Sequence, residues 1–278
     1  MRSIAVINQK GGVGKTTTTV NLAAALARSG KRVCLVDFDP QAHATLHLGI
    51  DPDAGGTSIY DVLAGNAHIA DVRKQVAENL HVVPSHIDLA AAEMELADEV
   101  GREVILRDKL AEDDGEFDFL LVDCPPSLGV LTLNALVTVR EVFLPLQPHF
   151  LALHGLSKLL ETIEVVARRL NRGLRLTGVI FCMYDRATRL AAEIREDVNS
   201  FLQAVEDDRC PWYGAEVFET CIRRNIRLAE APSFGQSIFD YAPHSNGAED
   251  YRSLADEVLV PASIRSRLSN SAAHLSAT

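Results

Sequence analysis

Short apolar runs alternate with stretches of helical periodicity along the chain. Runs typical of buried strands cover six segments: residues 4–8, 33–36, 80–84, 119–122, 142–145 and 176–182. Apolar side chains recur at helical spacing over 16–28 and most clearly over 153–170. Several runs are apolar at nearly every position, as expected where helices cover both faces of a parallel sheet. The pattern predicts a doubly wound, mostly parallel α/β sheet with helices on both faces.

Length and composition bear on the number of domains. The 278 residues are 47% hydrophobic and 23% charged, which is typical of globular proteins. This length suits two domains of about 150 residues, and it equally suits one larger α/β domain. Because strands and helices alternate without interruption, we predict one domain over 1–260. The Ser- and Ala-rich end predicts a flexible C-terminal tail over 261–278.

The charge is acidic overall and unevenly distributed. Lys and Arg number 27 against 38 Asp and Glu, which gives a net charge of −11. Acidic residues concentrate between 41 and 140, whereas arginines gather over 165–195 and 223–227. Any contact with nucleic acid must therefore come from a local basic patch. A solvated helix face is the alternative for each basic group.

The sequence contains no signal for export and no candidate membrane span. The chain enters its first apolar run without a signal peptide, and its longest uncharged stretches are short and contain prolines. The cysteines form no CxxC pair, so neither a disulfide framework nor a zinc site is expected. We predict a soluble cytoplasmic protein.

A glycine-rich loop directly follows the first strand and precedes the first helix. Residues 9–17 read QKGGVGKTT. Glycines let backbone N–H groups approach phosphate oxygens, and the helix N-terminus adds a positive dipole. In such a loop Lys15 reaches the β- and γ-phosphates and the Thr16 hydroxyl binds Mg²⁺. The predicted nucleotide-binding residues of the loop are Gly11, Gly12, Val13, Gly14, Lys15, Thr16 and Thr17.

The loop departs from the usual GxxxxGK[ST] pattern. Gln9 replaces the first glycine, and a second lysine, Lys10, stands at the loop entrance. The segment KGGVGKTT resembles the deviant Walker A motif of the ParA/MinD ATPases, in which this lysine reaches the partner's phosphates across a nucleotide-sandwich dimer. The resemblance implies that role for Lys10, ATP/ADP and Mg²⁺ as cofactors, and a homodimer with ATP. A solvated surface lysine is the alternative.

Two acidic segments follow predicted strands. Residues 36–41 read VDFDPQ and resemble the family's second acidic motif, and 121–127 read LVDCPPS and resemble its Walker B segment. Open α/β sheets bind ligands at the carboxyl ends of their strands. The resemblance implies that Asp39 positions the attacking water, and that Asp37 and Asp123 orient the water ligands of magnesium. The alternative is that Asp37 or Asp39 only caps the next helix.

Later motifs narrow the resemblance to the chromosomal ParA/Soj branch, over about residues 3–259. They are PLQP, LHGL, MYD, RNIRLAEAPS and NGAEDY. The branch implies an ATP hydrolase of weak activity, stimulated by a ParB-like partner. It also implies a nucleoid-associated protein that binds double-stranded DNA non-specifically and segregates or positions a chromosome, plasmid or protein cargo. Met183 and Arg224 are the further nucleotide contacts that the resemblance implies.

Non-specific DNA binding needs arginines that contact phosphates. The candidates are Arg186, Arg189, Arg223, Arg224 and Arg227. Of these, Arg227 matches a family arginine, whereas Ala187 stands where the family often has another. Arg186 or Arg189 is expected to replace it. Arg223 stands where relatives usually carry proline. Residues 207–214 form an insertion, expected to be a surface loop with Trp212 docked locally.

Other classes of function fit the sequence less well. A MinD-like membrane switch needs a basic amphipathic C-terminal helix, and residues 258–268 offer little apolar area. We therefore keep it as the alternative and expect no stable membrane binding. A sequence-specific repressor needs a DNA-reading module, for which the early phosphate loop leaves no N-terminal room. A metal–sulfur relative such as the nitrogenase iron protein shares the phosphate loop but needs cysteines that bind its cluster, and Cys124 alone is a poor match for such a ligand.

Overall fold

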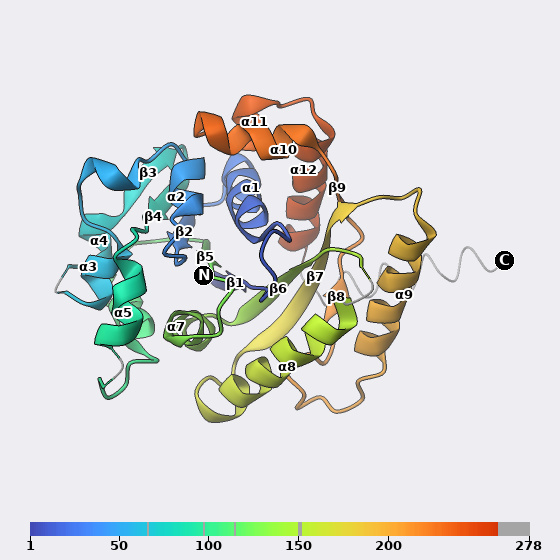
Figure 1. Cartoon of the computed structure of the whole chain (residues 1–278), viewed down its shortest axis with the longest axis horizontal. Helices are drawn as coiled ribbons and strands as arrows, with labels where there is room; N and C mark the ends of the chain where they lie inside the picture. The colour runs from blue at the N-terminus through green and yellow to red at the C-terminus, as the bar shows by residue number, and fades with distance from the viewer. Residues whose placement is uncertain (66, 97, 114, 150–151, 261–278) are drawn as a thin grey trace.

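A mostly parallel sheet runs through the middle of the molecule (Figure 1). The computed structural model describes residues 1–65, 67–96, 98–113, 115–149 and 152–260. Within these ranges nine strands pair in the order β3-β4-β2-β5-β1-β6-β7-β8, and β9 also pairs with β7. Only β3 runs antiparallel to its neighbour. The predicted fold class is confirmed.

The bounds of the strands are as follows: β1 (Arg2–Val6), β2 (Val33–Asp37), β3 (Lys74–Ala77), β4 (Leu80–Val83), β5 (Phe119–Asp123), β6 (Glu141–Leu146), β7 (Arg175–Tyr184), β8 (Glu216–Val217) and β9 (Ile222–Arg223). The helices up to the middle of the chain are α1 (Lys15–Arg28), α2 (His43–His47), η1 (Pro52–Ala54), α3 (Ile59–Leu63), α4 (Ile69–Val72), α5 (Leu89–Glu95), α6 (Ile105–Ala111) and α7 (Val130–Thr138). The remaining helices are α8 (Ala152–Arg169), α9 (Arg189–Gln203), α10 (Ile226–Glu230), η2 (Ala231–Phe234), α11 (Ile238–Tyr241) and α12 (Asn246–Leu259).

The strands separate two hydrophobic cores because successive side chains of a strand point to opposite faces. In β1, Ile4 and Val6 pack into the core that includes α1 and α12. Ala5, from the same strand, packs into the core that includes α7, α8 and α9. Helices therefore cover both faces, as the nearly all-apolar strands predicted.

Helix α8 confirms the predicted apolar stripe over most of its length. Its side chains from Leu156 to Ala167 at helical spacing are buried against the sheet. The prediction was wrong at Leu170, which lies just beyond the helix and is 44% exposed. Strands β3, β8 and β9 were not predicted. Strand β3 is mostly exposed and has no apolar run, and β8 and β9 have only two residues each.

The insertion at 207–214 forms turns beside the start of β7. Trp212 is partly buried and packs against the core, and the Leu176 N–H donates to the Pro211 carbonyl at 2.9 Å. The prediction of a loop with Trp212 docked locally is thus confirmed. The predicted tail, 261–278, lies outside the described residues. Among the described residues, no helix has the length and apolar character needed to cross a bilayer.

Candidate nucleotide site and arginine surface

The phosphate loop joins the carboxyl end of β1 to the first turn of α1. Gly12 and Gly14 have φ angles of 73° and 97°, which only glycine adopts readily. A side chain at Gly11 or Gly12 would meet nothing within 4 Å, so the loop backbone is open to a ligand. Gly14 is the N-cap of α1 and supplies no side-chain cap, which leaves the first helical N–H groups available for an anion.

Two threonines of α1 hold the Asp123 carboxylate at the end of β5. The Thr16 hydroxyl donates to Oδ2 at 2.7 Å, and the Thr19 hydroxyl donates to Oδ1 at 2.8 Å. Lys15 is only 7% exposed, and its positive charge favours the ionised form of Asp123. The structure therefore brings Lys15, Thr16 and Asp123 together, as the motifs predicted. Thr19 was not predicted, although it lies one helical turn after Lys15.

Asp37 ends β2 and lies opposite Asp123 in the parallel register of β2 and β5. Its Oδ2 accepts from the N–H and the hydroxyl of Thr45, both at 2.7 Å. Burial first, and then the charge of Asp123, raises the pKa of Asp37 above its usual range, and burial also raises the pKa of Asp123. Neither carboxylate has an ion-pair partner among the described residues. A divalent cation between them would relieve this cost, so the donor set fits Mg²⁺.

Asp39 lies two residues beyond β2 and is 7% exposed. Its Oδ1 accepts from the Gln41 N–H at 3.0 Å, and its backbone carbonyl accepts from the Ser85 hydroxyl at 2.8 Å. The N-cap of α2 is Ala42, so Asp39 does not cap that helix. Asp37 does receive an N–H from inside α2, so helix capping and a place in the site coincide there.

Lys10 occupies the exposed entrance of the loop. Its N–H donates to the Asn8 side chain at 2.9 Å, and the Asn8 amide donates to the Pro145 carbonyl at 2.8 Å. These bonds anchor the backbone under Lys10 to the end of β6. No carboxylate of the described residues lies within ion-pair distance of its ammonium group. The side chain is therefore available to a ligand or a second chain.

The end of β7 lies beside the phosphate loop. A Cβ on Gly14 would lie 3.5 Å from the Cβ of Cys182. The next residue, Met183, is half-buried and has a φ of 52°, which is uncommon for a residue with a side chain. Arg224 follows β9, which pairs with this end of β7. The structure thus places Met183 and Arg224 at the edge of the sheet that carries the loop.

A cavity of about 650 Å³ opens beside the loop. It is lined by Thr16, Thr17, His43, Leu46, His47, Gly49, Ile50, Asp51, Pro232, Ser233 and Gly235. These residues come from α1, α2 and η2 and the segments that adjoin them. Sequence reasoning did not predict the part contributed by α2 and η2, because only the tertiary fold brings these short elements beside α1.

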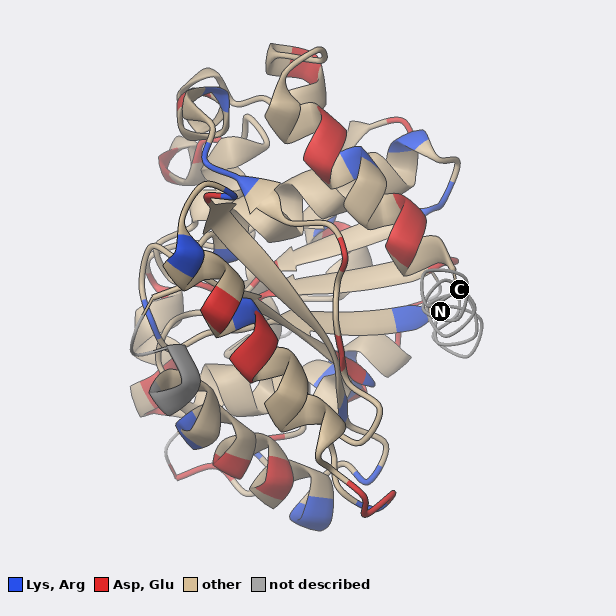
Figure 2. Ribbon diagram, turned by 90° about the vertical axis from the view of Figure 1, so that its right-hand side faces the viewer, with Lys and Arg blue, Asp and Glu red and all other residues tan. Residues whose placement is uncertain are grey.

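Four of the five candidate DNA-binding arginines are exposed. Arg186 and Arg224 are exposed and have no ion-pair partner among the described residues. Arg189, 92% exposed, pairs with Glu193 at 2.8 Å, and Arg227 pairs with Glu230 at the same distance. Basic and acidic positions are interspersed on the helices that Figure 2 presents. Exposed pairs of this kind are worth little, so phosphates can displace their carboxylates.

Arg223 differs from the other four arginines. Its guanidinium bonds to Asp250 and Glu249 of α12, and the Asp250 side chain is 7% exposed. Exchanging such a carboxylate for a phosphate would leave it buried and unpaired. The role of Arg223 as a DNA contact stays a prediction from the sequence, and its surroundings favour a different role.

Three comparisons agree with this geometry. A family model described as an AAA domain matches residues 1–176. The chain is 46% identical over 259 residues to the chromosome-partitioning ATPase Soj of Treponema pallidum, covering 93% of this chain and 97% of that protein. It is 42% identical over 262 residues to the chromosome partitioning protein ParA of Caulobacter vibrioides, covering 93% and 94%.

Solved structures have a similar fold. One is cobyrinic acid a,c-diamide synthase from Mycobacterium smegmatis with a bound ATP analog and magnesium. It has a TM-score of 0.78 and 38% identity, covering 93% of this chain and 94% of that one. Another is the septum site-determining protein MinD from Pyrococcus horikoshii with Mg-ADP, with a TM-score of 0.71 and 28% identity, covering 93% and 96%. With its deviant phosphate loop and paired strand-end carboxylates, the chain belongs to the ParA/Soj family of P-loop ATPases.

Proposed function

We propose that this protein is a partition ATPase that cycles between an ATP-bound dimer on DNA and a released form. ATP with Mg²⁺ closes two chains, the dimer holds double-stranded DNA without sequence preference, and a ParB-like partner stimulates hydrolysis. The cargo is a chromosome, a plasmid or a protein assembly. The observation that carries the proposal is the cluster of buried Lys15, Asp37 and Asp123 with the half-buried Thr16, on the loop that also carries Lys10, which has no ion-pair partner among the described residues.

The nucleotide would lie along the loop from Gly11 to Thr17, with ATP or ADP held by backbone N–H groups and by Lys15. Two similar solved structures hold an ATP analog with magnesium and Mg-ADP, which supports the choice of these ligands. Bound Mg²⁺ would neutralise charge on the phosphates. Thr16, Asp37 and Asp123 supply the oxygen atoms that hold the ion and its waters. Met183 and Arg224 are the remaining proposed nucleotide contacts.

Asp39 is the proposed positioning group for the attacking water. It lies at the carboxyl edge of the sheet, and one of its oxygens, Oδ2, makes no hydrogen bond within the described residues. A carboxylate with a spare acceptor can orient water. Its ties to Gln41 and Ser85 hold it still while the partner completes the site. This arrangement supports weak basal activity that a partner stimulates.

Lys10 supports the dimer. Lys10 is exposed, has no carboxylate partner among the residues that the structure describes, and lies on a loop anchored through Asn8, so it is suited to reach phosphates held by a second chain. Such a charge acts only after the two chains close. We therefore assign Lys10, Lys15 and Asp39 to catalysis.

DNA would bind through Arg186, Arg189, Arg224 and Arg227, on or beside β7, α9 and α10. Because the chain is acidic overall, only a concentrated patch can attract a duplex. A dimer presents two such patches to one duplex, which makes affinity depend on ATP. We propose that the protein acts in the cytoplasm, on the nucleoid. The MinD-like membrane alternative rests on residues 258–268, most of which lie outside the described residues.

Sedimentation with and without DNA tests the proposal. The wild-type chain with ATP and Mg²⁺ is expected to sediment as a dimer and to accompany two unrelated duplexes equally well. Lys10→Ala is expected to bind nucleotide but to stay monomeric and leave the DNA. Lys31→Ala, a change of the same charge at the far end of α1, serves as the control and should behave as wild type. A normal ATP-dependent dimer in Lys10→Ala would refute the assignment of Lys10.

A further inference from the structure

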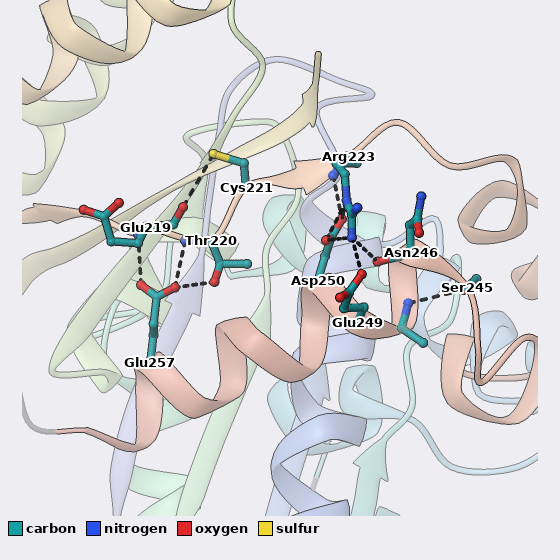
Figure 3. A network of polar contacts seen from close by, with 10 residues as sticks. Glu219, Thr220, Cys221, Arg223, Ser245, Asn246, Glu249, Asp250 and Glu257 are labelled. Carbon is teal, nitrogen blue, oxygen red and sulfur yellow. Dashed lines mark hydrogen bonds and ion pairs between the residues drawn. The ribbon is translucent and has the colours of Figure 1, made fainter. Parts of the chain in front are cut away.

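Helix α12 lies against the segment 219–223, which precedes Arg224 and Arg227 in the chain (Figure 3). Glu257 accepts hydrogen bonds from the backbone N–H groups of Glu219 and Thr220, at 2.9 and 2.7 Å. It also accepts from the Thr220 hydroxyl. One carboxylate thus fixes two consecutive backbone donors just before β9.

Two turns earlier on α12, Asp250 fixes the other end of the same segment. Its Oδ2 accepts from the Arg223 N–H at 2.8 Å, and its Oδ1 accepts from the Arg223 Nε at 2.9 Å and Nη2 at 2.6 Å. Glu249 adds a contact at 2.7 Å to Nη2 only, from a more exposed position. Asp250 therefore binds both the backbone and the side chain of Arg223, whereas Glu249 touches the side chain alone.

The segment held in this way leads directly into α10. Arg224 is the next residue, and Arg227 lies in the first turn of the helix. Helix α12 also touches α10 itself, because a Cβ on Gly247 would lie 2.8 Å from the Leu228 side chain. The backbone that leads into both arginines is therefore held by contacts with α12.

We infer that Asp250 and Glu257 are positioning residues that hold Arg224 and Arg227 toward the DNA, and that Arg223 is the partner of Asp250 rather than a phosphate contact. The inference rests on the proposed DNA binding.

The two possible roles of Arg223, phosphate contact or partner of Asp250, predict opposite changes in DNA affinity for the substitution Asp250→Asn. Asp250→Asn removes a negative charge and loosens Arg223. If Arg223 were a phosphate contact, binding would strengthen, and the slope of log K against log salt would steepen by roughly 1. If α12 positions the arginines, binding weakens, by roughly tenfold for the loss of charge-assisted hydrogen bonds.

The experiment measures ATP-dependent binding of one duplex across a salt series. Asp250→Asn and Glu257→Gln are each expected to weaken binding, and Glu249→Gln and Asp256→Asn are the matched controls. Each control removes one negative charge from α12 without touching the backbone of 219–223. The controls should bind as wild type or slightly more tightly. Stronger, more salt-dependent binding by Asp250→Asn would overturn the inference.

Amide hydrogen exchange separates this inference from the proposed function. Exchange at Glu219, Thr220 and Arg223 should accelerate in Glu257→Gln or Asp250→Asn and stay unchanged in Glu249→Gln, with or without DNA. If wild-type protein binds no DNA, the proposed function fails. Unchanged exchange in both variants would refute the positioning role of Asp250 and Glu257. If Asp250→Asn does not fold, Glu257→Gln carries the same test at the other end of the segment.

Discussion

At the carboxyl edge of the sheet, Lys15, Asp37 and Asp123 are buried, and residues of α1 and α2 hold the two carboxylates. The candidate arginines that follow β7 and β9 are exposed. Arg189 and Arg227 pair with carboxylates on their own helices, whereas Arg186 and Arg224 have no ion-pair partner among the described residues. Asp37 and Asp123 lie opposite each other in a regular register, and Thr16, Thr19 and Thr45 hold their oxygens. Among the described residues, Arg186, Arg189, Arg224 and Arg227 have no comparable set of buried acceptors.

The contrast shows two uses of charge. Buried carboxylates without a cation are costly, so their site is built for one ligand of defined charge. Exposed arginines with weak ion pairs cost little in the absence of DNA, and they can exchange carboxylates for the phosphates of a duplex of any sequence. The buried site is therefore suited to one kind of ligand, whereas the arginine surface is suited to any duplex. Arg223 stands between them, because its partner is nearly buried.

Lys15→Ala is expected to cause the largest change. It removes the buried ammonium group that faces the phosphates, and we expect nucleotide affinity to fall by about 100-fold or more, as for lost charge-assisted contacts in a desolvated site. Calorimetric titration with ATP and Mg²⁺ measures this directly. Undiminished affinity would contradict the phosphate-loop assignment, and Lys31→Ala controls for the loss of a lysine from the surface.

Asp39→Ala is expected to separate hydrolysis from binding. In its proposed role the carboxylate orients water and does not hold the nucleotide, so turnover should fall about 100-fold while ATP affinity stays within about threefold. Turnover is followed by phosphate release with DNA and the partner present. The variant should persist as an ATP-bound dimer on DNA. Asp53→Ala, an exposed carboxylate outside the site, is the control, and normal turnover in Asp39→Ala would rule out its role.

The nucleotide edge could be predicted from the sequence because its geometry follows from local pattern. Once residues 33–36 and 119–122 are strands of one parallel sheet, the acidic residues after them must meet at one edge. The glycine loop likewise specifies its own backbone. Thr45 and Ser85 could not be predicted, because their bonds depend on the packing of α2 against the end of β4.

Thr45→Val tests that unpredicted part of the site. It keeps the shape and the backbone N–H but removes the hydroxyl that donates to Asp37 and accepts from the Ser85 N–H at 2.9 Å. Residues that orient metal ligands typically contribute 10–100-fold, so we expect Mg²⁺ affinity in the presence of ADP to fall about tenfold. Thr45→Ser retains the hydroxyl and should restore the wild-type value. Equal affinity in both variants would mean that Asp37 needs no support from α2.

The arginine surface was less predictable. The sequence indicates a basic cluster, but the partners of Arg223 lie 26 and 27 residues further along the chain. No periodicity links β9 to α12. Only the packed structure distinguishes Arg223 from Arg224, its exposed neighbour.

Arg227→Ala should produce the smallest effect, and the comparison depends on it most. Arg227 pairs with Glu230 on the surface of α10, and each phosphate contact contributes roughly one unit to the slope of log K against log salt. The substitution should flatten that slope by roughly 1 and weaken two unrelated duplexes alike, since it removes charge and no base contact. The measurement uses the Asp39→Ala background with ATP, so that hydrolysis does not release the DNA.

Arg168→Ala, which changes an exposed arginine on α8 that pairs with Glu164, is the matched control. Because it lies away from α10, it should leave the slope unchanged. A preference for one duplex, or an unchanged slope in Arg227→Ala, would show that the second region is not the tolerant phosphate-binding surface that the exposed pairs indicate.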